Sequence, residues 1–132
     1  MPYSIAWNDD RTVVHQIYEG EISRGDFESM VFDSRGMLDS VLHPVDLMIE
    51  WRGERHVMQD LSMLYGAMFA ERRVPPNQRF VFAINTPPAF RVIAQALKRA
   101  APRTMGQLYF AQTVEQAYQL RTFLLEEQAK PS

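Results

Sequence analysis

Two short runs of the chain are mostly apolar, and they constrain the fold more than any other feature. Residues 45–51 read VDLMIEW and residues 79–85 read RFVFAIN. Strands with apolar side chains on both faces are typical of a sheet that is covered on both sides. Thr86-Pro87-Pro88 follows the second run at once and predicts a helix with Thr86 as N-cap and proline in its first position. The two runs therefore predict buried strands of α/β architecture.

Strand and helix patterns alternate along the rest of the chain. The predicted strands cover residues 3–7, 12–19, 45–51, 79–85 and 107–111. The first two, joined by turn residues, form an N-terminal hairpin. Four helices are predicted. The first covers residues 25–41, the second has its apolar stripe between residues 61 and 69, and the third and fourth begin at Thr86 and Thr113. Ser23 and Asp26 are spaced as a capping box for the first helix, and Ser34-Arg35-Gly36 predicts a weak point or break in its middle.

The predicted order is therefore β-β-α-β-α-β-α-β-α. Strands that alternate with helices need right-handed crossovers, which build a largely parallel sheet, and the opening hairpin adds one antiparallel strand. We expect an α/β fold with a single mixed, mostly parallel sheet. The 132 residues suit one domain over residues 1–128 with a polar tail at 129–132.

Composition narrows the classes of function. The formal charge of −2 gives no general attraction to nucleic acid, and the absence of cysteine excludes disulfides and thiolate chemistry. No apolar run approaches the roughly 20 residues that span a bilayer, and the N-terminal segment lacks the pattern of a signal peptide. We therefore expect a soluble, cytoplasmic protein.

Metal and cofactor sites are not expected. His15, His43 and His56 lie on a predicted strand, before a proline and in a loop, and no two of them have the i, i+4 spacing of helical metal ligands. The chain also lacks a glycine-rich phosphate loop.

Four segments together resemble the STAS domain (sulphate transporter and anti-sigma-factor antagonist) and its SpoIIAA-like relatives. They are TVVHQIYEGEIS running into DFESMV, the central VDLMIEW, RFVFAIN followed by a helix, and TVEQAYQL. The resemblance implies the same fold and a regulatory role without catalysis. It also implies a phosphorylatable serine in an Asp-Ser-Ser-Gly-type turn after the central strand. This chain has a longer, charged segment there, and Ser62, in Asp60-Leu61-Ser62, is the remaining phospho-acceptor candidate.

The ends of the two apolar strands are the first place to look for a binding site. In open α/β sheets, ligands bind beyond the carboxyl ends of the strands, where helix N-termini present free N–H groups. Arginine side chains there suit a carboxylate or phosphate. The alternative is a solvated loop in which Asp60 or Ser62 only caps a helix. The predicted ligand- or partner-binding residues are Trp51, Arg52, Arg55, His56, Asn85 and Thr86.

Two further groups of charged residues have alternative interpretations. Asp46 and Glu50 share one face of the third predicted strand and suit acid–base chemistry, a polar edge of the sheet face, or an ion pair with a neighbouring arginine. Cations at 91, 98, 99 and 103 suit either the dipole of the third helix or an acidic protein partner.

The sequence favours a non-enzymatic regulatory or ligand- and protein-binding module. It would recognise a protein or a small anionic or apolar ligand through the strand-end loops and the second and third predicted helices. One alternative is a switch like an anti-sigma-factor antagonist, phosphorylated at Ser62. Others are a lipid or small-molecule carrier, suggested by the many Met and Phe residues, and a small hydrolase using His56 and Asp60. An exposed edge strand or apolar helix face would allow a homodimer.

Overall fold

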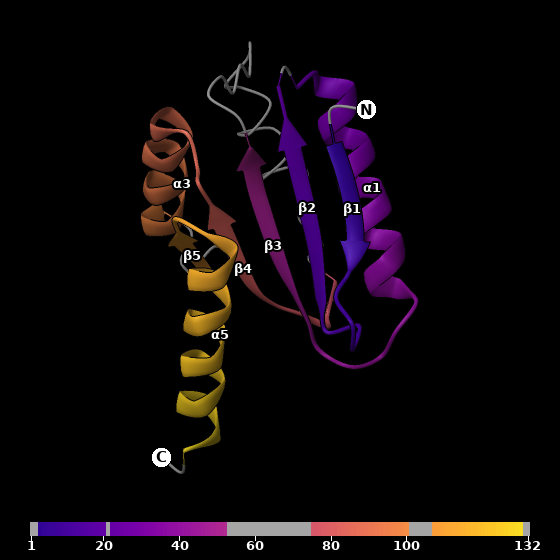
Figure 1. Ribbon diagram of the computed structural model, residues 1–132, viewed down its shortest axis with the longest axis vertical. Coiled ribbons are helices and arrows are strands. Elements are labelled where there is room, and N and C mark those ends of the chain that lie inside the picture. Colours follow the sequence, from indigo (N-terminus) through magenta and orange to yellow (C-terminus); the bar gives the residue numbers. More distant parts are fainter. Residues whose placement is uncertain (1–2, 21, 53–74, 101–106, 131–132) are drawn as a thin grey trace.

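The computed structural model describes residues 3–20, 22–52, 75–100 and 107–130. Within these ranges the chain forms a mixed sheet in the order β1-β2-β3-β4-β5, with β1 antiparallel to β2 and all other neighbours parallel (Figure 1). The strands are β1 (Tyr3–Trp7), β2 (Val13–Glu19), β3 (Val45–Arg52), β4 (Gln78–Ile84) and β5 (Leu108–Ala111). The helices are α1 (Arg24–Asp39), α3 (Pro88–Ala100) and α5 (Val114–Ala129).

The predicted α/β class and the single mixed, mostly parallel sheet are confirmed. In the described residues the elements follow one another as β-β-α-β-β-α-β-α. The helix predicted over residues 61–69, between the third and fourth strands, lies outside the described residues. The longer order β-β-α-β-α-β-α-β-α therefore stays a prediction.

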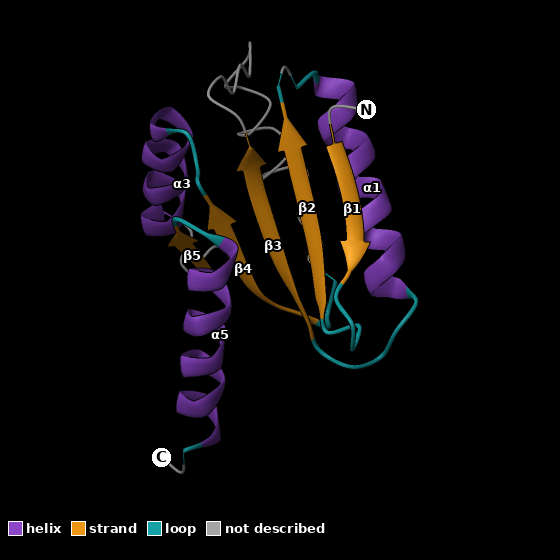
Figure 2. Cartoon of the chain, in the orientation of Figure 1, coloured by secondary structure: helices purple, strands orange, loops and turns teal. Residues whose placement is uncertain are grey.

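The strand order determines where the helices lie. The strands advance across the sheet in chain order, so right-handed crossovers place the connecting helices on one face. Met30 of α1 and Ala94 of α3 indeed belong to one core cluster, which also contains Trp51. Ala117 of α5 packs on the opposite face with Met48 and Phe82 (Figure 2). On that face α5 covers β3, β4 and β5, whereas no described helix covers β1 and β2.

Helix α1 begins at the predicted capping box but does not break where the sequence predicts. The Ser23 hydroxyl accepts from the Asp26 amide at 3.0 Å, and the Asp26 carboxylate accepts from the Ser23 amide at 2.9 Å. The expected break at Ser34 to Gly36 is wrong, because the helix continues to Asp39. The buried Gln16 side chain donates to the Ser34 hydroxyl at 2.6 Å, and this contact with β2 offsets the weak local propensity.

Helix α3 begins one residue later than the sequence predicts. The first helical hydrogen bond runs from the Arg91 amide to the Pro87 carbonyl at 3.0 Å, which makes Pro87 the N-cap residue and Pro88 the first helical position. The prediction of Thr86 as N-cap is therefore wrong. The physical reason is Pro88, because a residue that precedes proline is disfavoured in the helical conformation.

Candidate functional site

The carboxyl ends of β3 and β4 bring together several residues that the sequence proposes for binding. Trp51, Arg52, Asn85 and Thr86 are described there, whereas Arg55, His56 and Ser62 lie outside the described residues. The two strands are direct neighbours, with Glu50 in register with Ile84. One residue further on, the Asn85 side-chain amide donates to the Trp51 carbonyl at 2.8 Å. The two strand ends are thus joined by a side chain.

Asn85 also ties this edge to β5. Its φ of 53° lies in the left-handed region, which asparagine tolerates better than most residues. This conformation ends β4, and the backbone N–H of Asn85 donates to the Ala111 carbonyl at 2.9 Å. Asn85 therefore holds the carboxyl ends of three strands in a defined arrangement.

Trp51 lies at the centre of an aromatic stack beneath this edge. Its ring centroid is 5.7 Å from that of Tyr18 on β2 and 6.3 Å from that of Phe90 in the first turn of α3. Burial raises the pKa of Tyr18, so its hydroxyl stays protonated and the stack carries no charge. Trp51 is only 4% exposed, and its indole Nε1 is buried without a hydrogen-bond partner.

Thr86 carries the second buried polar atom without a partner. Because the helix begins at Pro88, its Oγ1 does not cap α3 and accepts or donates no hydrogen bond. Roughly 90% of buried polar groups in proteins are paired, and leaving one unpaired costs about 1–3 kcal/mol. Trp51 Nε1 and Thr86 Oγ1 are the two such side-chain atoms among the described residues. Both lie where β3 and β4 end and α3 begins.

Arg52 is already engaged by carboxylates. Its Nε donates to Glu50 Oε2 at 3.0 Å, and its Nη1 lies 3.9 Å from Glu19 Oε1. The hydrogen bond to Glu50 raises the pKa of Arg52. The side chain is half exposed, so an anion at Arg52 would have to compete with Glu50 for the guanidinium.

Glu50 has a second partner that the sequence did not indicate. His15 Nε2 on β2 lies 2.9 Å from Glu50 Oε1 on β3. Both side chains lie on the same face of the sheet as α5. The group formed by His15, Glu50 and Arg52 is partly exposed on that face. Of the interpretations of Glu50, the ion pair with a neighbouring arginine is observed.

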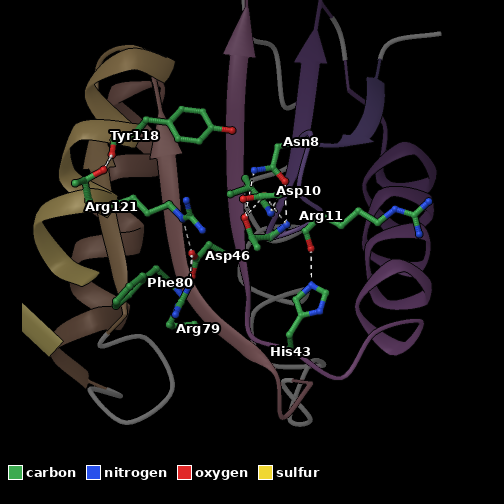
Figure 3. A network of polar contacts seen from close by, with 12 residues as sticks. Asn8, Asp10, Arg11, His43, Asp46, Arg79, Phe80, Tyr118 and Arg121 are labelled. Atoms are coloured by element: carbon green, nitrogen blue, oxygen red, sulfur yellow. Dashed lines mark hydrogen bonds and ion pairs between the residues drawn. The ribbon is translucent and has the colours of Figure 1, made fainter. Parts of the chain in front are cut away.

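The other end of β3 holds a polar cluster of a different kind (Figure 3). Asp46 is fully buried, and Arg79 from β4 and Arg121 from α5 both point at its carboxylate. Oδ1 accepts from Arg79 Nε at 3.0 Å and from the Phe80 amide at 2.9 Å. Oδ2 accepts from Arg79 Nη2 at 2.9 Å and from Arg121 Nε at 2.7 Å.

These contacts decide the charge state and role of Asp46. Burial by itself would raise the pKa of this carboxyl, but the hydrogen bonds from Arg79, Arg121 and Phe80 outweigh it and hold the pKa below its ordinary value. The four hydrogen bonds match the four lone-pair sites of a carboxylate, which leaves no free position for acid–base chemistry. The cluster joins α5 to β3 and β4. Asp46, like Glu50, therefore forms ion pairs with arginines.

The predicted basic stripe on α3 is partly used within the fold. The Arg91 guanidinium lies 5.0 Å from the centre of the Phe110 ring. Lys98 Nζ lies 4.8 Å from the centre of the Tyr109 ring and donates to the Leu108 carbonyl. Arg99 is exposed, and residue 103 lies outside the described residues. Two of the four cations therefore pack on β5.

No protein-family model matches the chain, and no curated protein matches it significantly. In the part of the chain that the structure describes, no group of three or more histidine or acidic side chains is placed to hold a metal ion. Among the same residues, no helix has the length and apolar character needed to cross a membrane.

Proposed function

We propose that the protein is a non-enzymatic regulatory module of STAS-like type that binds a ligand or a protein partner at the carboxyl ends of β3 and β4. One observation carries the proposal: Trp51 Nε1 and Thr86 Oγ1 are both buried and unpaired at this edge. An indole N–H can only donate a hydrogen bond. The group that completes the site is therefore an acceptor, such as a carboxylate, carbonyl or phosphate oxygen.

The start of α3 supports the same chemistry. Phe90, in its first turn, packs against Trp51, so the helix N-terminus lies beside the indole. The first amides of a helix lack partners within the helix and carry partial positive charge, which favours an anionic or strongly polar acceptor. Pro88 has no N–H, so the free amides of this turn are those of residues 89 and 90.

The STAS-like part of the proposal rests on two supports. One is the resemblance of the four sequence segments. The other is an antiparallel first strand followed by parallel strands that cross the sheet in chain order. A buried hydrogen-bond donor without a partner at the strand ends suits a module that binds a ligand.

A tryptophan-based titration tests the site. The chain has two tryptophans, so Trp7→Phe leaves Trp51 as the only indole emitter. We expect its fluorescence to respond to a carboxylate- or phosphate-bearing ligand, found by native mass spectrometry of protein purified without additions and by a panel of small acids. Thr86→Val in this background should weaken binding roughly tenfold, because one buried hydrogen bond is lost.

A second variant separates the indole N–H from the ring. Trp51→Phe keeps an aromatic ring between Tyr18 and Phe90 but removes the donor, and it should weaken binding as measured by calorimetry. Trp7→Phe is the matched control, because Trp7 lies on β1, away from this edge, and should bind like the wild type. Equal affinity in Trp51→Phe, Thr86→Val and the wild type would contradict the proposal.

A further inference from the structure

The outer edge of β1 carries backbone groups that the fold does not use. Among the described strands β1 is the end strand and pairs with β2 alone. The Asn8 amide donates to the Val13 carbonyl at 2.9 Å, so alternate residues Ser4 and Ala6 also direct their N–H and C=O groups toward β2. The N–H and C=O groups of Tyr3, Ile5 and Trp7 therefore point away from the sheet. In the described residues nothing is bonded to them.

This edge lacks the features that protect edge strands. Proteins block such edges with charged side chains, proline, bulges or very short strands. The strand reads YSIAW, without charge, proline or glycine, and its pairing with β2 runs through all five residues without a bulge. An edge of this kind is a template for another strand.

The opposite edge shows what protection looks like in the same molecule. Strand β5 has only four residues. The carbonyls of Gln107 and Ala111 accept hydrogen bonds from Val81 of β4 and from Asn85 just after it, so the Leu108 carbonyl points to the free side. Lys98 Nζ donates to that Leu108 carbonyl and places a cation on the edge. One edge is short and closed by lysine, whereas the other is longer, uncharged and open.

Strand β1 is complementary to a second copy of itself. An antiparallel pair with its two-fold axis at Ile5 sets Ile5 opposite Ile5, Tyr3 opposite Trp7 and Ser4 opposite Ala6 of the other copy. The outward-facing residues 3, 5 and 7 are spaced evenly about that axis, so each outward N–H meets an outward C=O. Aromatic side chains then face each other across the strands, and no like charges are opposed.

We propose that this protein forms a homodimer in which β1 pairs antiparallel with β1 of a second copy, joining the two sheets into one. The two-fold axis reverses the direction of every strand, so β2 to β5 of one copy run antiparallel to β2 to β5 of the other. Their carboxyl edges then face opposite directions, which keeps Trp51 of one copy away from Trp51 of the other. The dimer is thus independent of ligand binding at Trp51.

Mass measurement over a wide range of protein concentrations tests the dimer. Light scattering coupled to size-exclusion chromatography should give twice the chain mass for the full chain. Amide hydrogen exchange followed by NMR should show that the amides of Tyr3, Ile5 and Trp7 are protected, although they face away from β2. A chain that is monomeric at every concentration, or that leaves these three amides unprotected, overturns the proposal.

Three variants locate the interface. Ile5→Pro removes an outward N–H that β2 does not use, and Ser4→Lys with Ala6→Lys adds charge at two exposed positions of the strand. Both should yield monomers with wild-type circular dichroism, and the double lysine variant decides if Ile5→Pro fails to fold. Phe32→Lys is the control, because Phe32 is 77% exposed on the outer side of α1. It should stay dimeric, and a dimer that survives the edge variants or is lost in Phe32→Lys overturns the assignment.

Discussion

The two ends of strand β3 treat buried polar groups in opposite ways. Near the start, the Asp46 carboxylate accepts four hydrogen bonds from Arg79, Arg121 and Phe80. Near the end, Trp51 Nε1 is equally buried and has none. A polar group that is fully paired inside the protein holds the fold together, whereas one that is buried and unpaired is a cost that a ligand can remove. Under the function proposed above, the paired end maintains the fold and the unpaired end is the place for a ligand.

The paired end should show the largest loss when it is broken. Asp46→Ala leaves two largely buried arginines without their counter-ion, and we expect the free energy of unfolding to fall by about 3–5 kcal/mol. Urea unfolding measures the change. Asp33→Ala, at an exposed position of α1, is the control and should stay within about 0.5 kcal/mol of the wild type. A loss below about 1 kcal/mol for Asp46→Ala would show that the cluster does not hold α5 to the sheet.

The same cluster predicts a pH dependence. Its hydrogen bonds hold the pKa of Asp46 below the ordinary value of 3.8, so the ionised form stabilises the folded state. This contribution is complete above pH 3.8 and is lost as the pH falls below it, through the pKa of the folded state. The difference in unfolding free energy between the wild type and Asp46→Asn should therefore shrink in acid. A difference that stays constant down to acid unfolding would contradict the low pKa.

The link between the strand ends should give an intermediate effect. Asn85→Ala loses the hydrogen bond to the Trp51 carbonyl and places alanine at a φ of 53°, and we expect a cost of about 2 kcal/mol. Asn85→Gly loses the same hydrogen bond but adopts this φ without strain, so it should cost roughly 1 kcal/mol less than alanine. Thermal unfolding of the two variants separates the backbone and side-chain contributions. Equal losses would show that the left-handed conformation carries no cost at this position.

The unpaired end should show the smallest effect on stability. Thr86→Val removes a buried hydroxyl that has no partner, and it should leave the free energy of unfolding unchanged or raise it by about 1 kcal/mol. Urea unfolding of the ligand-free protein gives the value. Ser34→Ala is the matched comparison, because its hydroxyl is paired with Gln16, and it should cost about 1–3 kcal/mol. If Thr86→Val cost as much as Ser34→Ala, the contrast between paired and unpaired groups would fail.

Part of the site was readable before the structure. Trp51 and Asn85 lie at the ends of two mostly apolar predicted strands. Strands that follow one another in the chain are usually neighbours in the sheet, so their ends could be placed together. Thr86 was placed at this edge because it follows the neighbouring strand, whereas its predicted role as N-cap is wrong, since Pro87 takes that position. His15 was missed as the partner of Glu50, since nothing local in the chain links residues 35 positions apart.

The sequence alone determined the elements that depend on near neighbours. Alternation within β3 depends on residues two apart, and the Ser23–Asp26 capping box joins residues three apart, so both are written locally in the chain. Only the tertiary structure decided which cations meet Asp46, since Arg79 and Arg121 lie 33 and 75 residues away. It also decided which face α5 covers and which of the described strands lies at an open edge. These features depend on strand order and on burial, which exist only once distant parts of the chain have packed together.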